Sequence, residues 1–397
     1  MVACKNGTRQ GEIAKSERKH LAEHIVMDVE NSLDLLQGLL VHIAWHHVYL
    51  QSMAQIDMLV HLALGQLTSL ELNQPQNSRQ PMNFLRELGA TNNQTSRTLE
   101  ERRTYLGCFY LTSLFSTCIR SIEPVRWTKY TDECCRAVEE ALEYSSDNSL
   151  VHLVRLFRFA DKINSTILSN DLPGGSISLP LELSIRWFQE ELQSLKASFP
   201  SETPQSAIIQ LHYHTVEILL YRISIIGEPS DTYGDHSLTQ LDLLLSCLKS
   251  TKSFFSSFYS LPAGLFPIFP YTIWAQFGHA IVVLSRLSLY RSNHGGWDQE
   301  YVRNTIDYYG TCDELVRKLE EAQPLYEKDQ GQNRQGMFEV FSKVYSRVNL
   351  MKDSHRRRQE AAQPSALPPD PALDPQFLLS MSLDEIFSFS QIGDFFF

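Results

Sequence analysis

Residues 100–135, EERRTYLGCFYLTSLFSTCIRSIEPVRWTKYTDECC, indicate the fold of this chain most clearly. Just before them, Thr98 has an acid three residues later and fits a capping box, in which a hydroxyl and an acid satisfy two backbone N–H groups at a helix start. Pro124 interrupts the helical pattern because proline breaks a helix interior. Thr128 or Thr131 can then cap the next helix. The stretch therefore predicts two capped helices joined by a proline turn.

Helical periodicity continues through most of the remaining chain. Apolar residues recur at spacings of three and four along 33–50, 56–70 and 150–168, which is the pattern of helices that bury one face. No strand-type alternation of any length appears. We predict an all-α fold: a large irregular multi-helix domain, with room for two helical halves and with disordered termini. The helical patterns of the second half cover 181–198, 204–226, 236–259, 269–290, 298–322 and 337–351.

Composition divides the chain into three parts. Residues 1–24 form a polar N-terminal tail, and 25–351 carry the helical patterns. Residues 352–397 begin with a basic cluster, continue through a Pro- and Ala-rich linker and end in an acidic, aromatic segment. Within the helical part, the clearest break is a Pro-Gly-Gly sequence, so a hinge between subdomains is expected at 171–180.

Charge and cysteine content limit the classes of function. The chain has 397 residues and a formal net charge of −11, whereas DNA affinity depends on clustered Lys and Arg that neutralise phosphates. No signal peptide or membrane span is apparent, so we expect a soluble intracellular protein without membrane partners. The seven cysteines are scattered and odd in number. They are expected to be buried apolar residues in a reducing compartment rather than a disulfide framework.

Several motifs suggest an enzyme, and none is supported by its surroundings. His20, Glu23 and His24 fit the inverted zinc-protease pattern, but they lie in the polar tail. His42 and His46 have the spacing of zinc ligands without further ligands nearby, so a packed or surface pair is the better interpretation. No Asp-Asp pair, Walker loop or nucleophile elbow is present. We expect no catalytic residues, no metal, no cofactor and no enzymatic activity.

Two interpretations are open for the charges at the start of the 100–135 stretch. On a helix, Glu100 and Arg103 are neighbours, and such pairs are commonly surface ion pairs. Alternatively, one arginine is buried and ties this helix to an acid on another.

The C-terminal part contains two candidate functional segments. The arginines of the basic cluster suggest a nuclear import signal, although a solvated helix end is an equal alternative. The final segment interleaves acids with aromatic and aliphatic residues, as activation segments do, and such segments dock as short amphipathic helices in a partner's groove. The alternative is that this tail folds back onto the helical domain. The import residues are Arg356, Arg357 and Arg358, and the activation segment comprises Leu383, Asp384, Glu385, Ile386, Phe387, Phe389, Phe395, Phe396 and Phe397.

Several short sequences, in order, resemble one family. Residues 101–111, ERRTYLGCFYL, are similar to the middle homology region of fungal zinc binuclear cluster transcription factors, and so are RWT at 126–128 and ECC at 133–135. LLQGLL at 35–40 adds to the resemblance, which covers about 30–350 and extends to regulators in secondary-metabolite gene clusters. The residues that carry this regulatory-domain signature are Arg102, Arg103, Gly107, Cys108, Arg126, Trp127, Cys134 and Cys135.

The resemblance implies a nuclear regulator of a fungal biosynthetic gene cluster. Its helical domain would control activity, and its tail would recruit transcription machinery or co-activators. Family members carry six closely spaced cysteines that hold two zinc ions and contact DNA, whereas only Cys4 precedes the helical patterns here. We therefore expect action through a DNA-binding partner or a homodimer, with direct DNA binding only if an upstream zinc cluster has been lost from this sequence. The alternative is an all-α small-molecule-binding protein or enzyme without a DNA function.

Overall fold

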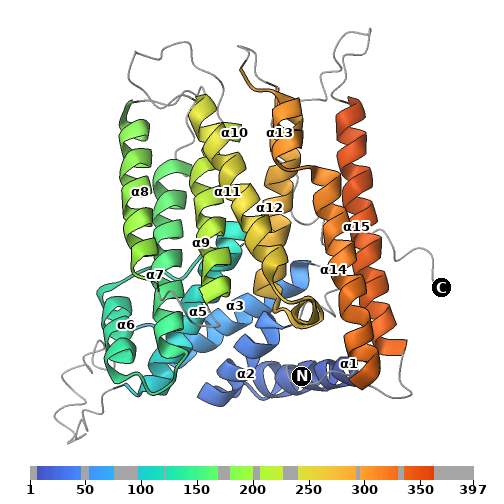
Figure 1. Cartoon of the computed structure of the whole chain (residues 1–397). Helices are drawn as coiled ribbons and strands as arrows, with labels where there is room; N and C mark the ends of the chain where they lie inside the picture. The colour runs from blue at the N-terminus through green and yellow to red at the C-terminus, as the bar shows by residue number, and fades with distance from the viewer. Residues whose placement is uncertain are drawn as a thin grey trace, which may run out of the picture.

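A computed structural model describes most of the helical part of the chain. Every regular element in this part is helical, which confirms the predicted all-α fold. Most of the helices stand side by side, while the first three lie across one end of the array (Figure 1). The described residues are 7–45, 53–75, 97–119, 122–168, 179–199, 206–226, 240–291, 296–329 and 335–361.

The helices are named here in chain order. Those of the first half are α1 (Gly7–Leu21), a π-helical turn (Ala22–Met27), α2 (Leu33–Ala44), α3 (Met53–Ser69), α5 (Leu99–Cys118), α6 (Lys129–Ala141), α7 (Asp147–Ile163) and a second π-helical turn (Asn164–Leu168). Those of the second half are α8 (Leu179–Ala197), α9 (Ser206–Tyr221), α10 (Ile223–Ile226), α11 (Gln240–Ser260), the 3₁₀ helix η4 (Ala263–Ile268), α12 (Tyr271–Leu289), α13 (Gln299–Thr305), α14 (Tyr308–Asp329) and α15 (Gln335–Ala361).

Two hydrophobic cores share their central helices. The first core is built mainly by α2, α3 and α5–α8, and the second by α11–α15. Helix α9 gives Val216 to the first core and Ile218 to the second, while α12 gives Ala275 to the first and Phe277 to the second. Because one helix buries opposite faces in two cores, burial of apolar surface stabilises both cores together.

Both capping predictions are confirmed. Thr98 and Glu101 form a complete capping box at the start of α5, with the Glu101 N–H donating to the Thr98 hydroxyl at 3.1 Å. Thr128 is the N-cap of α6, and Thr131 closes a second box by accepting from the Thr128 N–H at 3.1 Å. These bonds satisfy N–H groups that have no partner within the helix.

The structure differs from the predicted boundary at the N-terminus. Most of the expected polar tail of 1–24 forms α1, which contacts α15. Leu21, inside the predicted tail, and Ile25, just after it, are both buried in the first core. Two apolar residues do not make a recognisable stripe in the sequence, and the surfaces that cover them come from distant parts of the chain.

The expected linker start at 352 is also corrected. Helix α15 continues to Ala361 because His355 anchors it. The His355 ring is 3% exposed, lies 3.9 Å from the Tyr308 ring in a stacked arrangement and bonds through Nδ1 to the Ser285 hydroxyl at 2.7 Å. The predicted disordered termini and most of the predicted hinge at 171–180 lie outside the described residues.

The helix expected over 298–322 is two helices. α13 ends at Thr305 and α14 begins at Tyr308, because Asp307 starts a new helix. Its Oδ2 accepts the Gly310 N–H at 2.5 Å, and its carbonyl accepts the Thr311 hydroxyl at 2.6 Å. An acid at this position satisfies N–H groups of the first turn and favours a helix start.

The cysteines behave as predicted wherever the structure describes them. Six of the seven are buried and free of disulfides, and Cys4 lies outside the described residues. Burial raises the pKa of Cys108 and of Cys118 to about 12, so both thiols are protonated and unreactive at neutral pH.

Candidate functional site

Among the residues of the predicted regulatory signature, Arg103 makes several polar contacts to acids outside its own helix. Its Nε and Nη2 donate to the two carboxylate oxygens of Asp147 at 2.8 and 2.9 Å, and Nη2 also donates to Glu143 at 2.7 Å. The Arg103 guanidinium lies 4.6 Å from the centroid of the Tyr144 ring. Of the two interpretations of these charges, the tie to an acid on another helix is the one observed, made by a half-buried Arg103 to the buried Asp147. Glu100 instead accepts from Gln37 of α2.

This ion pair joins the start of α5 to the start of α7. The Asp147 side chain is only 2% exposed and that of Arg103 17% exposed. The guanidinium holds the pKa of Asp147 below its usual range, and the carboxylates raise the pKa of Arg103. Bidentate geometry fixes orientation as well as distance, so this contact sets how the two helices meet.

Trp127 forms a second contact between the same helices. Its ring packs edge-on against Phe109 of α5 at 5.3 Å, and its Nε1 donates to Asp132 of α6 at 3.2 Å. The Arg158 guanidinium of α7 lies 4.2 Å from the centroid of the Trp127 ring and contacts Asp132 at 3.4 Å. The proline turn is thus tied to α5, α6 and α7 together.

The remaining signature residues have different surroundings. Cys108, Cys134 and Cys135 are buried, and Gly107 faces Leu40 of α2 at a distance that would accommodate a methyl group. Arg126 is exposed and contacts Glu123 at the surface at 3.5 Å, while Arg102 Nε donates to the Arg97 carbonyl at 3.2 Å. The structure therefore brings Arg103, Trp127 and the cysteines into one region of α5–α7, while Arg126 points into solvent.

A seam of mostly buried polar side chains joins α5, α9 and α12, the last two of which contribute to both cores. The Tyr110 hydroxyl lies 2.7 Å from His212 Nε2, and Gln276 Nε2 lies 3.1 Å from the same nitrogen. Thr215 donates to Gln276 Oε1 at 2.8 Å. Since His212 Nδ1 faces the Ile208 carbonyl at 2.7 Å, Nδ1 carries the proton and Nε2 accepts. Burial lowers the pKa of His212 to about 4, so the ring is neutral at pH 7.

The histidines that fit enzyme motifs are engaged elsewhere. His24 bonds to Glu30 at 2.9 Å, and its ring lies 4.2 Å from that of His20. His42 is buried and bonds to Glu17 at 3.2 Å, while His46 lies outside the described residues. In the part of the chain that the structure describes, no group of three or more His, Cys, Asp and Glu side chains is placed to hold a metal ion.

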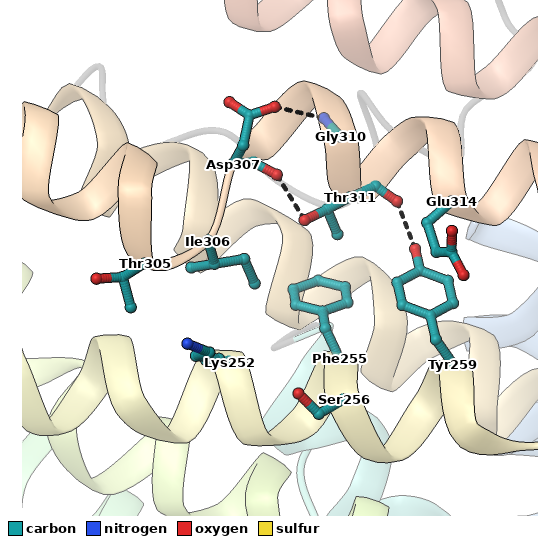
Figure 2. A pocket seen from close by; sticks show the side chains of 10 residues that line it. All are labelled: Lys252, Phe255, Ser256, Tyr259, Thr305, Ile306, Asp307, Gly310, Thr311 and Glu314. Atoms are coloured by element: carbon teal, nitrogen blue, oxygen red, sulfur yellow. Dashed lines mark hydrogen bonds between the residues drawn. The ribbon is translucent and has the colours of Figure 1, made fainter.

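A surface groove lies between α11 and the junction of α13 and α14. Its cavity volume is about 330 Å³. The rings of Phe255 and Tyr259 and the Ile306 side chain line its apolar part, with Lys252 and Ser256 on the α11 side (Figure 2). The Tyr259 hydroxyl donates to the Thr311 carbonyl at 2.5 Å and holds α11 against α14. The sequence did not predict this groove because α13 and α14 were expected to be one helix.

The two C-terminal candidates lie at and beyond the end of the described chain. Arg356 and Arg357 are exposed in the last turns of α15, and Arg358 is half-buried with its Nη2 donating to Ser354 at 2.7 Å. The predicted activation segment from Leu383 to Phe397 lies outside the described residues. Within those residues, no helix is both long and apolar enough to span a membrane.

Comparison with known proteins identifies fungal transcription factors as relatives. Transcription factor opdL of Penicillium oxalicum is 29% identical over 328 residues, 80% of this chain and 57% of its own length. Transcription factor himD of Aspergillus japonicus is 26% identical over 279 residues, 68% of this chain and 46% of its own. A transcription factor of Aspergillus terreus is 27% identical over 212 residues, half of this chain and 35% of its own.

The last part of the chain matches a described family. The ATEG07667_C family, described as a C-terminal domain, matches residues 265–390, from η4 into the tail. No solved structure matches. The resemblance to fungal transcription factors is thus confirmed, and the chain spans about half the length of the curated relatives that it matches.

Proposed function

We propose that this chain regulates transcription of a fungal secondary-metabolite gene cluster. The observation that carries the proposal is similarity to a named transcription factor over 80% of the chain. The helical array acts as a scaffold that other parts of the regulator contact.

DNA contact is assigned to a DNA-binding partner or to an upstream zinc cluster. The net charge of −11 disfavours DNA binding by the helical array itself, because phosphate contacts need clustered cations. A partner of this kind, or a second copy that brings two DNA-binding segments together, would supply those cations.

The tail is the segment assigned to recruitment of transcription machinery or co-activators. Residues such as Leu383, Ile386 and Phe387 supply apolar anchors, and Asp384 and Glu385 keep the segment solvated until it docks. The test fuses the full chain to an unrelated DNA-binding domain upstream of a reporter gene. Deletion of 376–397 should abolish activation, whereas deletion of 362–375 shortens only the linker and should preserve it. Unchanged activation after the first deletion would show that the tail is not needed for activation.

Nuclear entry is assigned to the end of α15. Arg356 and Arg357 are exposed there and present their charges to solvent. Replacing Arg356, Arg357 and Arg358 by alanine should leave a fluorescent fusion in the cytoplasm, while the matched replacement of the exposed Arg126, Lys129 and Arg136 should not. Equal nuclear signal in both variants would assign import to another segment.

A further inference from the structure

The groove between α11 and α14 has an apolar interior with exposed lysines on one side. Phe255, Tyr259 and Ile306 line the interior (Figure 2), while Lys249 and Lys252 are exposed on α11. Neither lysine has an ion-pair partner among the described residues. On the opposite wall, the Asp307 carboxylate caps α14 and Glu314 pairs with Arg317. The positive charge of the groove therefore lies on its α11 side, at Lys249 and Lys252.

The groove also lies close to the end of the described chain. The Tyr309 hydroxyl contacts Gln359 at 3.5 Å, so the last turn of α15 adjoins the first turn of α14. Asp307 and Gly310 of the groove wall lie at that same turn. The chain thus leaves α15 beside the groove, and whatever follows Ala361 is tethered there at high local concentration.

The tail has the composition that the groove would accept. Residues 383–389, LDEIFSF, combine two adjacent acids with Ile386, Phe387 and Phe389. The twenty-one residues between Ala361 and Leu383 are rich in proline, and such linkers extend by about 3 Å per residue. This length is ample for a groove that adjoins the end of α15.

We propose that residues 383–389 dock in the groove between α11 and α14 of the same chain. The Phe387 ring inserts against Phe255 and Ile306, and Asp384 and Glu385 face Lys249 and Lys252. Apolar burial supplies most of the affinity, and the charges select the orientation of the segment.

Docking has a regulatory consequence that rests on the proposed function. A Phe387 side chain held in the groove cannot also contact transcription machinery, so docking and recruitment exclude each other. The groove then sets how much of the tail is free.

The test uses photo-crosslinking in the full chain and needs no transcriptional readout. A photoreactive phenylalanine replaces Phe387, and cross-linked peptides are identified by mass spectrometry over a dilution series. We expect cross-links within one chain to 252–259 and 305–314, independent of concentration. Cross-links that form only between two copies, or only to other surfaces, would overturn the proposal.

Substitutions in the groove give the control. Lys249→Glu with Lys252→Glu should lower the yield of these cross-links about fivefold, because two attractions become repulsions. Asp384→Lys with Glu385→Lys should restore it, and the same charge change at Lys129 and Arg136, which are exposed on α6, should have no effect. Equal yields in all variants would contradict the docking geometry.

A second variant separates docking from its consequence. Ser256→Trp fills the groove from an exposed position and should both abolish the cross-links and raise reporter activation by a tethered full chain about threefold, by freeing the tail. Lost cross-links with unchanged activation would overturn the regulatory consequence. If the chain activates no reporter at all, the proposed function fails while the cross-links still decide the docking.

Discussion

The α5–α7 region and the aromatic cluster around Phe258 are both buried, but different forces hold them. In α5–α7, Arg103 and Trp127 make directional contacts to Asp147 and Asp132. In the second core, the Phe258 ring lies 5.0 Å from that of Phe277 and 5.1 Å from that of Phe266. Directional contacts fix one geometry, while ring packing depends on filled volume. The two regions should therefore respond differently to loss of volume and to loss of charge.

The largest effect should come from removing volume in the aromatic cluster. Phe258→Ala leaves a cavity among fully buried rings and should lower the free energy of unfolding by about 4 kcal/mol. Chemical denaturation followed by circular dichroism measures this loss. Leu265→Ala, at a position 37% exposed, is the control and should cost less than about 1 kcal/mol. Similar losses in both variants would mean that ring packing is not what stabilises this region.

Removing charge from the α5–α7 region should have the next largest effect. Asp147→Asn keeps the shape but leaves Arg103 without its main counter-charge, so the free energy of unfolding should fall by about 3 kcal/mol. Glu123→Gln removes the exposed partner of Arg126 and should change it by less than about 0.5 kcal/mol. If the two variants lose equal stability in the same denaturation series, the Arg103 pair is no more than a surface contact.

Lowering the pH should destabilise the protein through the buried His355 at the end of α15. Burial lowers the pKa of His355 to about 4, whereas an unfolded histidine titrates near 6.5. A folded pKa below the unfolded one gives stability that is complete above about pH 6.5 and is lost as the pH falls toward 4. At pH 5 the loss from this residue should be roughly 2 kcal/mol.

The matching variant is His355→Gln, which keeps a polar partner for Ser285. Its unfolding free energy should fall less between pH 7 and pH 5 than that of the natural chain. The contributions of His212 and of carboxylates such as Asp147 are common to both proteins and cancel in this comparison. Parallel losses in the two proteins would show that His355 titrates normally in the folded state.

The smallest effect should come from a helix cap in α5. Thr98→Ala removes the hydroxyl that accepts the Glu101 N–H and should lower the free energy of unfolding by about 1 kcal/mol. Thr98→Ser keeps the hydroxyl and should be nearly neutral. A serine variant as unstable as the alanine variant would assign the loss to the methyl group rather than the cap.

Local signals in the sequence were enough to predict the helices and their caps. Thr98 and Thr128 were predictable because capping depends on residues three positions apart. The partner of Arg103 could not be predicted, because Asp147 lies 44 residues away and the sequence offers several other acids that could pair with this arginine. The sequence did not predict that α1 and the end of α15 are helical, for the same reason. Leu21 and His355 are buried by surfaces from distant parts of the chain.

The buried polar seam of α5, α9 and α12 has a consequence for assembly. Gln276 meets His212 and Thr215 only when α12 lies in one register along α9. Sliding either helix by one turn would still bury apolar residues. It would also leave the Gln276 amide, the His212 imidazole and the Thr215 hydroxyl buried without hydrogen-bond partners, at a cost of about 1–3 kcal/mol for each group. Apolar surfaces alone would accept several alignments, so these polar contacts select one alignment of α9 and α12.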